Sequence, residues 1–248
     1  LYERVLSGGS YQWIQRRTGN YSSVVVARTG GVTRWFAAAW GDKVYTSTDG
    51  TTWSTVGTGF PTGIARIALA VQPDNPNVLY ALIATATFNA LYGVRRLDGA
   101  AGSWKTVSGA PTVLPTDSYG YSQGDYDLCI TVDPNNANLI YMGGSYFDDG
   151  NIYPASIWRA TVSPSGSAYA MTATSIGGNA HADVHVLTHT PGNSNKLWAG
   201  SDGGVFLNTD PTGAGGFESR NTGLATLCTN YISQHPTEPA VLYTGLQD

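Results

Sequence analysis

Three aspartates recur at one position of a repeated sequence pattern, directly after a predicted strand. Asp42, Asp202 and Asp248 each belong to a tight, glycine-containing turn. Glycoside hydrolysis needs two carboxyl groups about 5 to 9.5 Å apart, one as acid and the other as base or nucleophile. Because Asp202 and Asp248 lie in neighbouring repeats, we predict that they form such a catalytic pair. The alternative is that each aspartate only caps its own turn.

A second candidate group lies in the segment His181-Ala182-Asp183-Val184-His185. Alternate side chains of a β-strand share one face, about 6.6 Å apart at each step, so His181, Asp183 and His185 would point to the same side. Imidazole and carboxylate groups bind zinc and other divalent metals, which makes a divalent metal the candidate cofactor. The alternative is a polar contact at the mouth of a channel, without metal.

A third group combines aromatic rings with acids. Residues 118–127 join three tyrosines to two aspartates that come late in the loop, and residues 146–149 repeat the combination. A sugar ring offers a C–H face that stacks on an aromatic ring and hydroxyls that bond to carboxylates. The alternative is that these side chains only pack the loops. The predicted substrate-binding residues are Trp40, Asp42, Tyr119, Tyr121, Asp125, Tyr126 and Gln247.

These residues must be positioned by a repeated β-unit. Four segments share a β-rich run, a turn containing proline and asparagine, and a second β-rich run that ends in an aromatic residue. They are 67–80, 130–141, 184–198 and 231–243, with a fainter copy at 24–36. A recurrence of roughly 45 to 60 residues is typical of a propeller blade. No helical periodicity extends over a dozen residues, so the chain is predicted to be all-β.

We predict a single β-propeller domain over residues 1–248, built from four-stranded blades. The blades are expected at about 19–60, 61–115, 116–178 and 179–226, with a fifth formed by 227–248 and completed by 1–18. Pairing of the N- and C-terminal strands would then close a five-bladed ring. The alternative is part of a larger propeller of seven or more blades.

In such blades the loops fall on two opposite rims. The loops from each second strand to the third, and from each blade to the next, share one rim, and they are the longer ones here. Long loops on a rigid scaffold often carry binding and catalysis. We call this rim the top rim; it comprises residues 40–43, 57–66, 84–93, 109–127, 143–156, 177–183, 200–204, 220–230 and 245–248.

Residues 47–53 form a turn of the opposite kind, with a structural role. In the sequence Ser-Thr-Asp-Gly-Thr-Thr-Trp, Ser47 and Asp49 are expected to bond nearby amides, and Gly50 to adopt a positive φ. Trp53 would fill the gap between strands. The turn resembles, one residue shorter, the Asp box of BNR-repeat propellers.

The wider pattern extends this resemblance over nearly the whole chain. Segments 123–127, 132–134, 181–185, 200–205 and 245–248 look like those of secreted bacterial BNR/Asp-box repeat propellers. That group is related to the sortilin-type propellers and to the xyloglucanase-type glycoside hydrolases. In xyloglucanases a catalytic aspartate stands in an Asp-x-Gly-Gly context, and Asp202 matches that position with one residue fewer before the glycines. Sortilin-type propellers, by contrast, imply a non-catalytic binding role.

The low charge of the chain and its lack of long apolar runs exclude some classes of function. The 248 residues carry a net charge of −4 and only 12% charged residues, which argues against a nucleic-acid partner. No apolar run approaches the roughly 18 residues that a membrane span needs. The scarcity of charge and the abundance of glycine and tyrosine suggest a secreted or cell-surface protein. Cys129 and Cys228 could form one disulfide or remain two buried thiols.

The sequence therefore predicts an extracellular β-propeller that binds or cleaves carbohydrate. If it is an enzyme, it is a glycoside hydrolase acting on a polysaccharide. The alternative is a non-catalytic propeller module for interaction with a protein or a cell surface.

Overall fold

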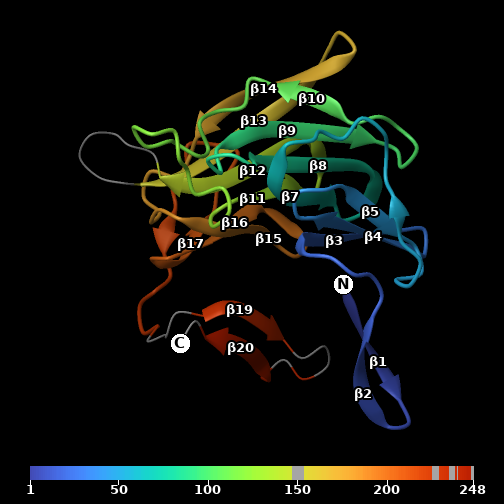
Figure 1. Ribbon diagram of the computed structural model, residues 1–248. Coiled ribbons are helices and arrows are strands. Elements are labelled where there is room, and N and C mark those ends of the chain that lie inside the picture. The colour runs from blue at the N-terminus through green and yellow to red at the C-terminus, as the bar shows by residue number, and fades with distance from the viewer. Residues whose placement is uncertain (147–153, 225–228, 235–237, 239, 247–248) are drawn as a thin grey trace.

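The protein is all-β in a computed structural model that describes residues 1–146, 154–224, 229–234, 238 and 240–246. These residues form twenty strands, labelled β1 to β20 (Figure 1). Among the described residues there is no helix that is long and apolar enough to cross a membrane.

Sixteen of the strands form four antiparallel meanders of four strands each. The first comprises β3 (Tyr21–Thr29), β4 (Val32–Ala39), β5 (Val44–Ser47) and β6 (Ser54–Thr55), and the second β7 (Ile64–Gln72), β8 (Asn75–Thr85), β9 (Leu91–Asp98) and β10 (Lys105–Ser108). The third comprises β11 (Cys129–Asp133), β12 (Asn136–Tyr146), β13 (Ala155–Ser165) and β14 (Ala168–Ser175), and the fourth β15 (Val184–Thr190), β16 (Asn193–Ser201), β17 (Gly204–Asn208) and β18 (Glu218–Ser219).

The second and third meanders are joined at their outer strands. β10 pairs in parallel with β14, with Val107 opposite Tyr169 and Ser108 opposite Ala170. The eight strands therefore form one continuous sheet, in the order β11-β12-β13-β14-β10-β9-β8-β7.

Three apolar layers lie between successive meanders, because the inner strands are apolar on both faces. In β8, alternate side chains enter different layers: Leu79 and Ile83 pack toward the first meander, while Tyr80 and Leu82 pack toward the third. A third layer between the third and fourth meanders contains Tyr141, Ile157, Val184, Leu197 and Phe206. The sheets thus pack face to face in chain order, as propeller blades do.

Short polar turns close the strand pairs, as the repeats predict. At the β11–β12 turn, the Asp133 carboxylate accepts the amides of Asn135 at 2.8 Å and Asn136 at 3.0 Å. The pairing register shifts at this turn and at the equivalent turns of β7–β8 and β15–β16. These turns therefore fix the register of the inner strands.

The turn at residues 47–53 has the predicted local chemistry. The Asp49 carboxylate accepts the amides of Thr51 at 2.8 Å and Thr52 at 2.7 Å. The hydrogen bonds from Thr52 and Thr51 hold the pKa of Asp49 well below its usual range. Gly50 has φ +74°, and the Trp53 indole donates to the Gly50 carbonyl at 3.0 Å. The turn supports the fold at the rim opposite the candidate site.

The N- and C-terminal strands, which were predicted to complete a fifth blade, do not pair with each other within the described residues. β1 (Tyr2–Ser7) pairs with β2 (Ser10–Gln15), and β19 (Thr229–Gln234) pairs with β20 (Leu242–Leu246), but within the described residues these are separate two-stranded sheets. Figure 1 shows the two hairpins apart from each other, on one side of the meanders. The β1–β2 hairpin buries neither of its faces, so it lacks the apolar layer that joins the other sheets. The five-bladed ring and the larger propeller both stay predictions.

Of the two cysteines, Cys129 is a buried free thiol at the start of β11. Its Sγ lies 3.5 Å from the Val184 carbonyl oxygen, to which it donates. Cys228 lies outside the described residues. Cys129 therefore belongs to the apolar layer between the third and fourth meanders.

His189 is expected to make the fold less stable in mild acid. Its ring lies against Tyr141 in β12, with centroids 5.2 Å apart, and burial lowers the pKa of His189 below its usual value. Below about pH 6.5 the unfolded chain therefore binds a proton that the folded chain resists. The free energy of unfolding should fall by at most about 1.4 kcal/mol per pH unit as the pH drops toward the folded pKa. Urea unfolding at pH 7.5 and 5.5 should show a smaller loss in His189→Gln than in the wild type. The exposed His181→Gln should behave like the wild type, and an unchanged loss in His189→Gln would contradict the assignment.

Candidate functional site

Three segments of the top rim meet at Asp202, between β16 and β17. One carboxylate oxygen of Asp202 lies 2.7 Å from Nε2 of His185 in β15. The Tyr126 hydroxyl, from the loop before β11, donates to the same carboxylate, with both oxygens at 3.2 Å. The Tyr126 and His185 rings are nearly perpendicular, with centroids 4.7 Å apart. These three side chains form the candidate site.

The turn that carries Asp202 depends on small residues and backbone bonds. The Asp202 amide donates to the Asp183 carbonyl at 3.3 Å. A side chain at Gly203 would place a Cβ 2.3 Å from the side chain of His181, so only glycine fits there. The adjacent Gly204 has φ +107°, which other residues rarely adopt. The sequence Asp-Gly-Gly thus fixes where the carboxylate stands.

The loop that carries Tyr126 is held by hydrogen bonds from Arg66 and by hydrogen bonds within the loop. The Arg66 guanidinium of β7 donates to the carbonyls of Asp125, at 3.2 Å, and of Tyr126. The Gln123 carbonyl accepts the amides of Tyr126 at 2.8 Å and of Asp127 at 2.9 Å. The second meander therefore positions a loop of the third. Nothing in the sequence around Arg66 distinguishes it as a site residue.

The geometry suits proton transfer at an open rim. The side chains of His185 and Asp202 are 34% and 38% exposed, so both are accessible to water and to a ligand. The Asp202 carboxylate can accept a proton, and His185 can hold or release one at Nε2. Solvent screens the attraction between the two groups, so their pairing adds little to stability.

The predicted metal-binding group is not brought together. His185 bonds Asp202, and the His181 ring has its Nδ1 3.0 Å from the Ala182 carbonyl. Within the part of the chain that the structure describes, no three metal-ligating side chains are placed to share an ion. The reason is local: β15 begins at Val184, and Asp183 has φ +60°. The strand alternation that would have aligned His181 with His185 therefore does not extend to residues 181–183.

The other predicted residues are distributed along the rim. The Asp42 carboxylate accepts the Tyr45 hydroxyl at 2.5 Å, and Trp40 beside it is exposed. Both lie in the loop between β4 and β5 of the first meander, whereas Asp202 lies between β16 and β17 of the fourth. Asp248 and Gln247 lie outside the described residues. The predicted Asp202–Asp248 pair therefore stays a prediction.

An aromatic surface lies on the top rim, and it includes a residue that the sequence reasoning missed. The Phe88 and Tyr121 rings are perpendicular, with centroids 4.8 Å apart, and Tyr119 nearby in the chain is also exposed. The Phe88 carbonyl accepts the Ser122 amide at 2.8 Å, and the Asn89 carbonyl accepts the Gly124 amide at 2.9 Å. The β8–β9 loop thereby holds the tyrosine loop.

Backbone strain marks the same rim. Among the described residues, three that are not glycine have positive φ: Phe88 at +69°, Asn89 at +50° and Asp183 at +60°. All three belong to the top rim. Such conformations cost about 1 to 3 kcal/mol each and cluster at functional sites. In the sequence, only the position of Phe88 in a long rim loop pointed to it. Its contact with Tyr121 could not be predicted, because the two residues belong to different loops.

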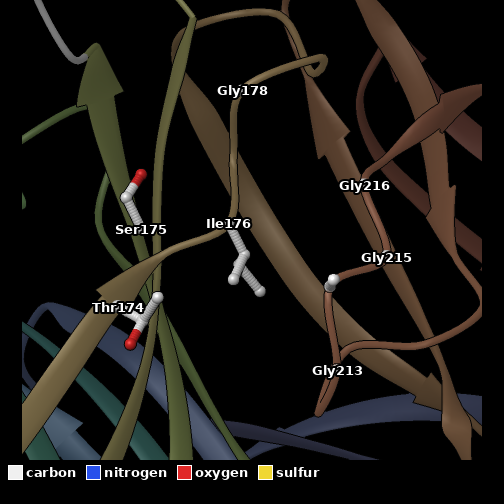
Figure 2. A pocket seen from close by; sticks show the side chains of 8 residues that line it. Thr174, Ser175, Ile176, Gly178, Gly213, Gly215 and Gly216 are labelled. Carbon is white, nitrogen blue, oxygen red and sulfur yellow. The ribbon is translucent and has the colours of Figure 1, made fainter.

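Two surface hollows lie away from the candidate site. One of about 270 Å³ is lined by residues 174–176, Gly178 and 213–216. Figure 2 shows Ile176 extending toward the glycine segment, whose backbone forms the opposite wall. The other, of about 360 Å³, is lined by residues 15–18. Neither is lined by Asp202 or Tyr126. The candidate site is instead reached directly from solvent through the partly exposed side chains of His185 and Asp202.

Among the comparisons with known proteins, the one with solved structures bears on the fold. No family model matches this sequence, and no curated protein matches it either. Among solved structures, the fold resembles that of GH74 enzymes, which are propeller-type glycoside hydrolases.

One of these structures is an ancestral GH74 enzyme, with a TM-score of 0.51 and 19% identity over 98% of this chain and 28% of that one. Another is the GH74 enzyme of Niastella koreensis, with a TM-score of 0.55 and 18% identity over 84% of this chain and 33% of that one. This chain thus spans about a third or less of the length of these enzymes. At this level of identity the likeness shows the fold alone.

Proposed function

We propose that this protein acts on polysaccharide, and that the top rim binds the glycan and presents it to Asp202. The observation that carries the proposal is the Asp202 carboxylate, solvent-accessible and held by His185 and Tyr126. The fold that presents it resembles that of glycoside hydrolases. The low charge and the abundance of glycine and tyrosine in the sequence favour a secreted or cell-surface setting.

The binding half of the proposal rests on the aromatic rim. Phe88, Tyr119 and Tyr121 present apolar ring surface to solvent, and Tyr126, later in the same loop as the two tyrosines, is exposed and bonds Asp202. Pyranose rings with equatorial hydroxyls expose flat C–H faces that stack on such rings. Nearby carboxylates such as that of Asp125 can accept hydrogen bonds from the hydroxyls at the ring edge.

The catalytic half assigns a role to each group around Asp202. A carboxylate that accepts hydrogen bonds from the Tyr126 hydroxyl and from Nε2 of His185 suits a base or a nucleophile. Hydrolysis also needs a second carboxyl group, which protonates the departing glycosidic oxygen. Asp248 is the proposed acid, by its equivalent place in the neighbouring repeat.

Binding to a panel of soluble polysaccharides tests the rim directly. We expect Tyr121→Ala and Phe88→Ala each to weaken binding about tenfold, equivalent to about 1.4 kcal/mol, because each removes a stacking surface. Tyr11→Ala is the matched control, since Tyr11 is 57% exposed and Tyr121 56%, but Tyr11 lies on the β1–β2 hairpin. Affinity electrophoresis or calorimetry would measure the effect. Wild-type affinity in both rim variants would contradict the assignment of this surface.

A non-catalytic interaction module is the second candidate function. The β1–β2 hairpin supports it, because Tyr2, Leu6, Tyr11 and Trp13 are exposed there and occupy one face by their pairing register. Exposed apolar patches of this kind often mark protein interfaces. Ligand binding without any product from wild-type protein would favour this candidate over hydrolysis.

A further inference from the structure

Asp127 is a buried acid with no part in the chemistry proposed above. Its side chain is 0% exposed, and neither carboxyl oxygen receives a hydrogen bond within the described residues. An ionised carboxylate is strongly disfavoured in such a place. The group must therefore be neutralised, either by a proton or by a cation.

The ionisable groups around Asp127 come from three segments. Asp183, just before β15, is the neighbouring acid, Arg66 approaches from β7, and Cys129 begins β11 two residues after Asp127. Burial and then the Asp183 carboxyl raise the pKa of Asp127 to about 9, against a smaller opposing effect of Arg66. Burial raises the pKa of Cys129 to about 12, so this thiol adds no charge at neutral pH. Two neighbouring carboxyl groups can bond each other only if one of them is protonated.

Asp183 links this acid pair to the candidate site. Its backbone has φ +60°, and its amide donates to the Ser145 carbonyl of β12 at 2.9 Å. Its own carbonyl accepts the Asp202 amide at 3.3 Å, and His185 follows two residues later. The position of Asp183 thus affects both partners of the His185–Asp202 contact.

We infer that Asp127 and Asp183 share one proton at neutral pH, and that this buried acid pair fixes the backbone of Asp183 and thereby the positions of Asp202 and His185. Close carboxylates commonly retain one proton between them, and such a bond is short and strong. Asp127 is thus a positioning residue. The value of positioning Asp202 and His185 rests on the proposed function. The experiments below need no substrate, so the inference about the acid pair and the proposed function can fail separately.

The shared proton predicts a particular pH dependence of stability. The folded chain keeps a proton on the pair up to about pH 9, whereas the unfolded chain releases it near pH 4. Between these limits the folded chain binds one proton more, so stability falls as the pH rises. Because of the pair, the equilibrium constant for unfolding increases by up to tenfold for each unit by which the pH rises.

Urea unfolding from pH 5 to 8 compares the wild type with Asp127→Asn, whose amide keeps the shape and a donor but does not titrate. We expect the unfolding constant of Asp127→Asn, relative to wild type, to fall by up to tenfold per pH unit. Asp183→Asn replaces the other acid and tolerates the positive φ. It should keep part of the wild-type pH dependence, because Asp127 stays buried. Asp74→Asn, an exposed acid in the β7–β8 turn, should follow the wild type. Parallel curves for wild type and Asp127→Asn, or a curve for Asp183→Asn identical to that of the wild type, would overturn the inference.

Two further measurements separate positioning from mere stability and a proton from a cation. In NMR spectra, the ring signals of His185 and Tyr126 should shift in Asp127→Ala and return in Asp127→Asn. Unchanged ring signals in Asp127→Ala would refute the positioning role. Addition of Mg²⁺, Ca²⁺ or Zn²⁺ should not stabilise the wild type relative to Asp127→Asn. A stabilisation that requires Asp127 would show that the pair binds a cation instead.

Discussion

Replacing Asp202 by asparagine is expected to slow polysaccharide hydrolysis by about 10²- to 10⁴-fold, the usual contribution of a positioned acid or base. Asparagine keeps the size of the side chain and can still bond the Tyr126 hydroxyl. It cannot accept a proton from water or attack a sugar, however. Binding should therefore stay within about threefold of wild type while turnover falls, a separation of kcat from KM that only a transition-state role produces.

Reducing-end release from a panel of β-glucans would measure this effect. Asp74→Asn, far from the rim in the β7–β8 turn, provides a control of the same chemistry. Equal turnover in wild type and Asp202→Asn would show that Asp202 is not the catalytic base or nucleophile. If wild-type protein releases no product from any substrate but binds one, the non-catalytic module becomes the better description.

Replacing Arg96 by alanine is expected to lower the free energy of unfolding by about 3 kcal/mol, near the lower end for a broken buried ion pair. Arg96 is 7% exposed in β9, and Asp98 is partly open to solvent, which reduces the effect. The guanidinium donates to the Asp98 carboxylate at 2.9 Å, the Tyr80 hydroxyl at 2.8 Å and the Asn138 side-chain oxygen at 2.6 Å. It also lies over the Tyr169 ring, 4.4 Å from the centroid. Its removal leaves acceptors of the second and third meanders without their donor.

Urea unfolding at neutral pH would measure the Arg96 effect. Arg95→Ala is the matched control, since its neighbour Arg95 contacts the Tyr92 ring at 5.2 Å and is only half-buried. We expect Arg95→Ala to cost about 0.5 kcal/mol or less. Arg96→Lys should fall between the two, because an ammonium cannot span three acceptors. A cost for Arg96→Ala no larger than for Arg95→Ala would contradict the role given to this network.

Much of the β-architecture could be predicted because it depends on local patterns. The continuous apolar run at residues 78–84 fills two layers at once, which is the signature of a strand buried on both faces. The turn chemistry of Asp49 and Asp133 also involves only near neighbours. Such features need no knowledge of the distant chain.

The site was harder to predict because its contacts join distant segments. The sequence indicated Asp202 and Tyr126 separately, but only the fold shows that Tyr126 bonds Asp202. The metal prediction failed because strand alternation was extended into residues 181–183, which precede β15. The pairing of the terminal strands stays a prediction, because the β1–β2 hairpin buries neither face and so lacks the apolar layer that joins the other sheets. In the sequence, Asp127 is one more polar residue of a loop. Its burial results from packing against distant segments, which the sequence alone does not reveal.

The parallel pairing of β10 with β14 has a consequence for solubility. The outer strand of a sheet offers free backbone groups to which another chain can add, which promotes aggregation. Here β10 and β14 satisfy each other, and the outer strands of the first and fourth meanders, β6 and β18, are each only two residues long. The outer edges of the four meanders therefore present little template for intermolecular β-addition, so exposed aromatics on the top rim do not stand beside a long free outer strand.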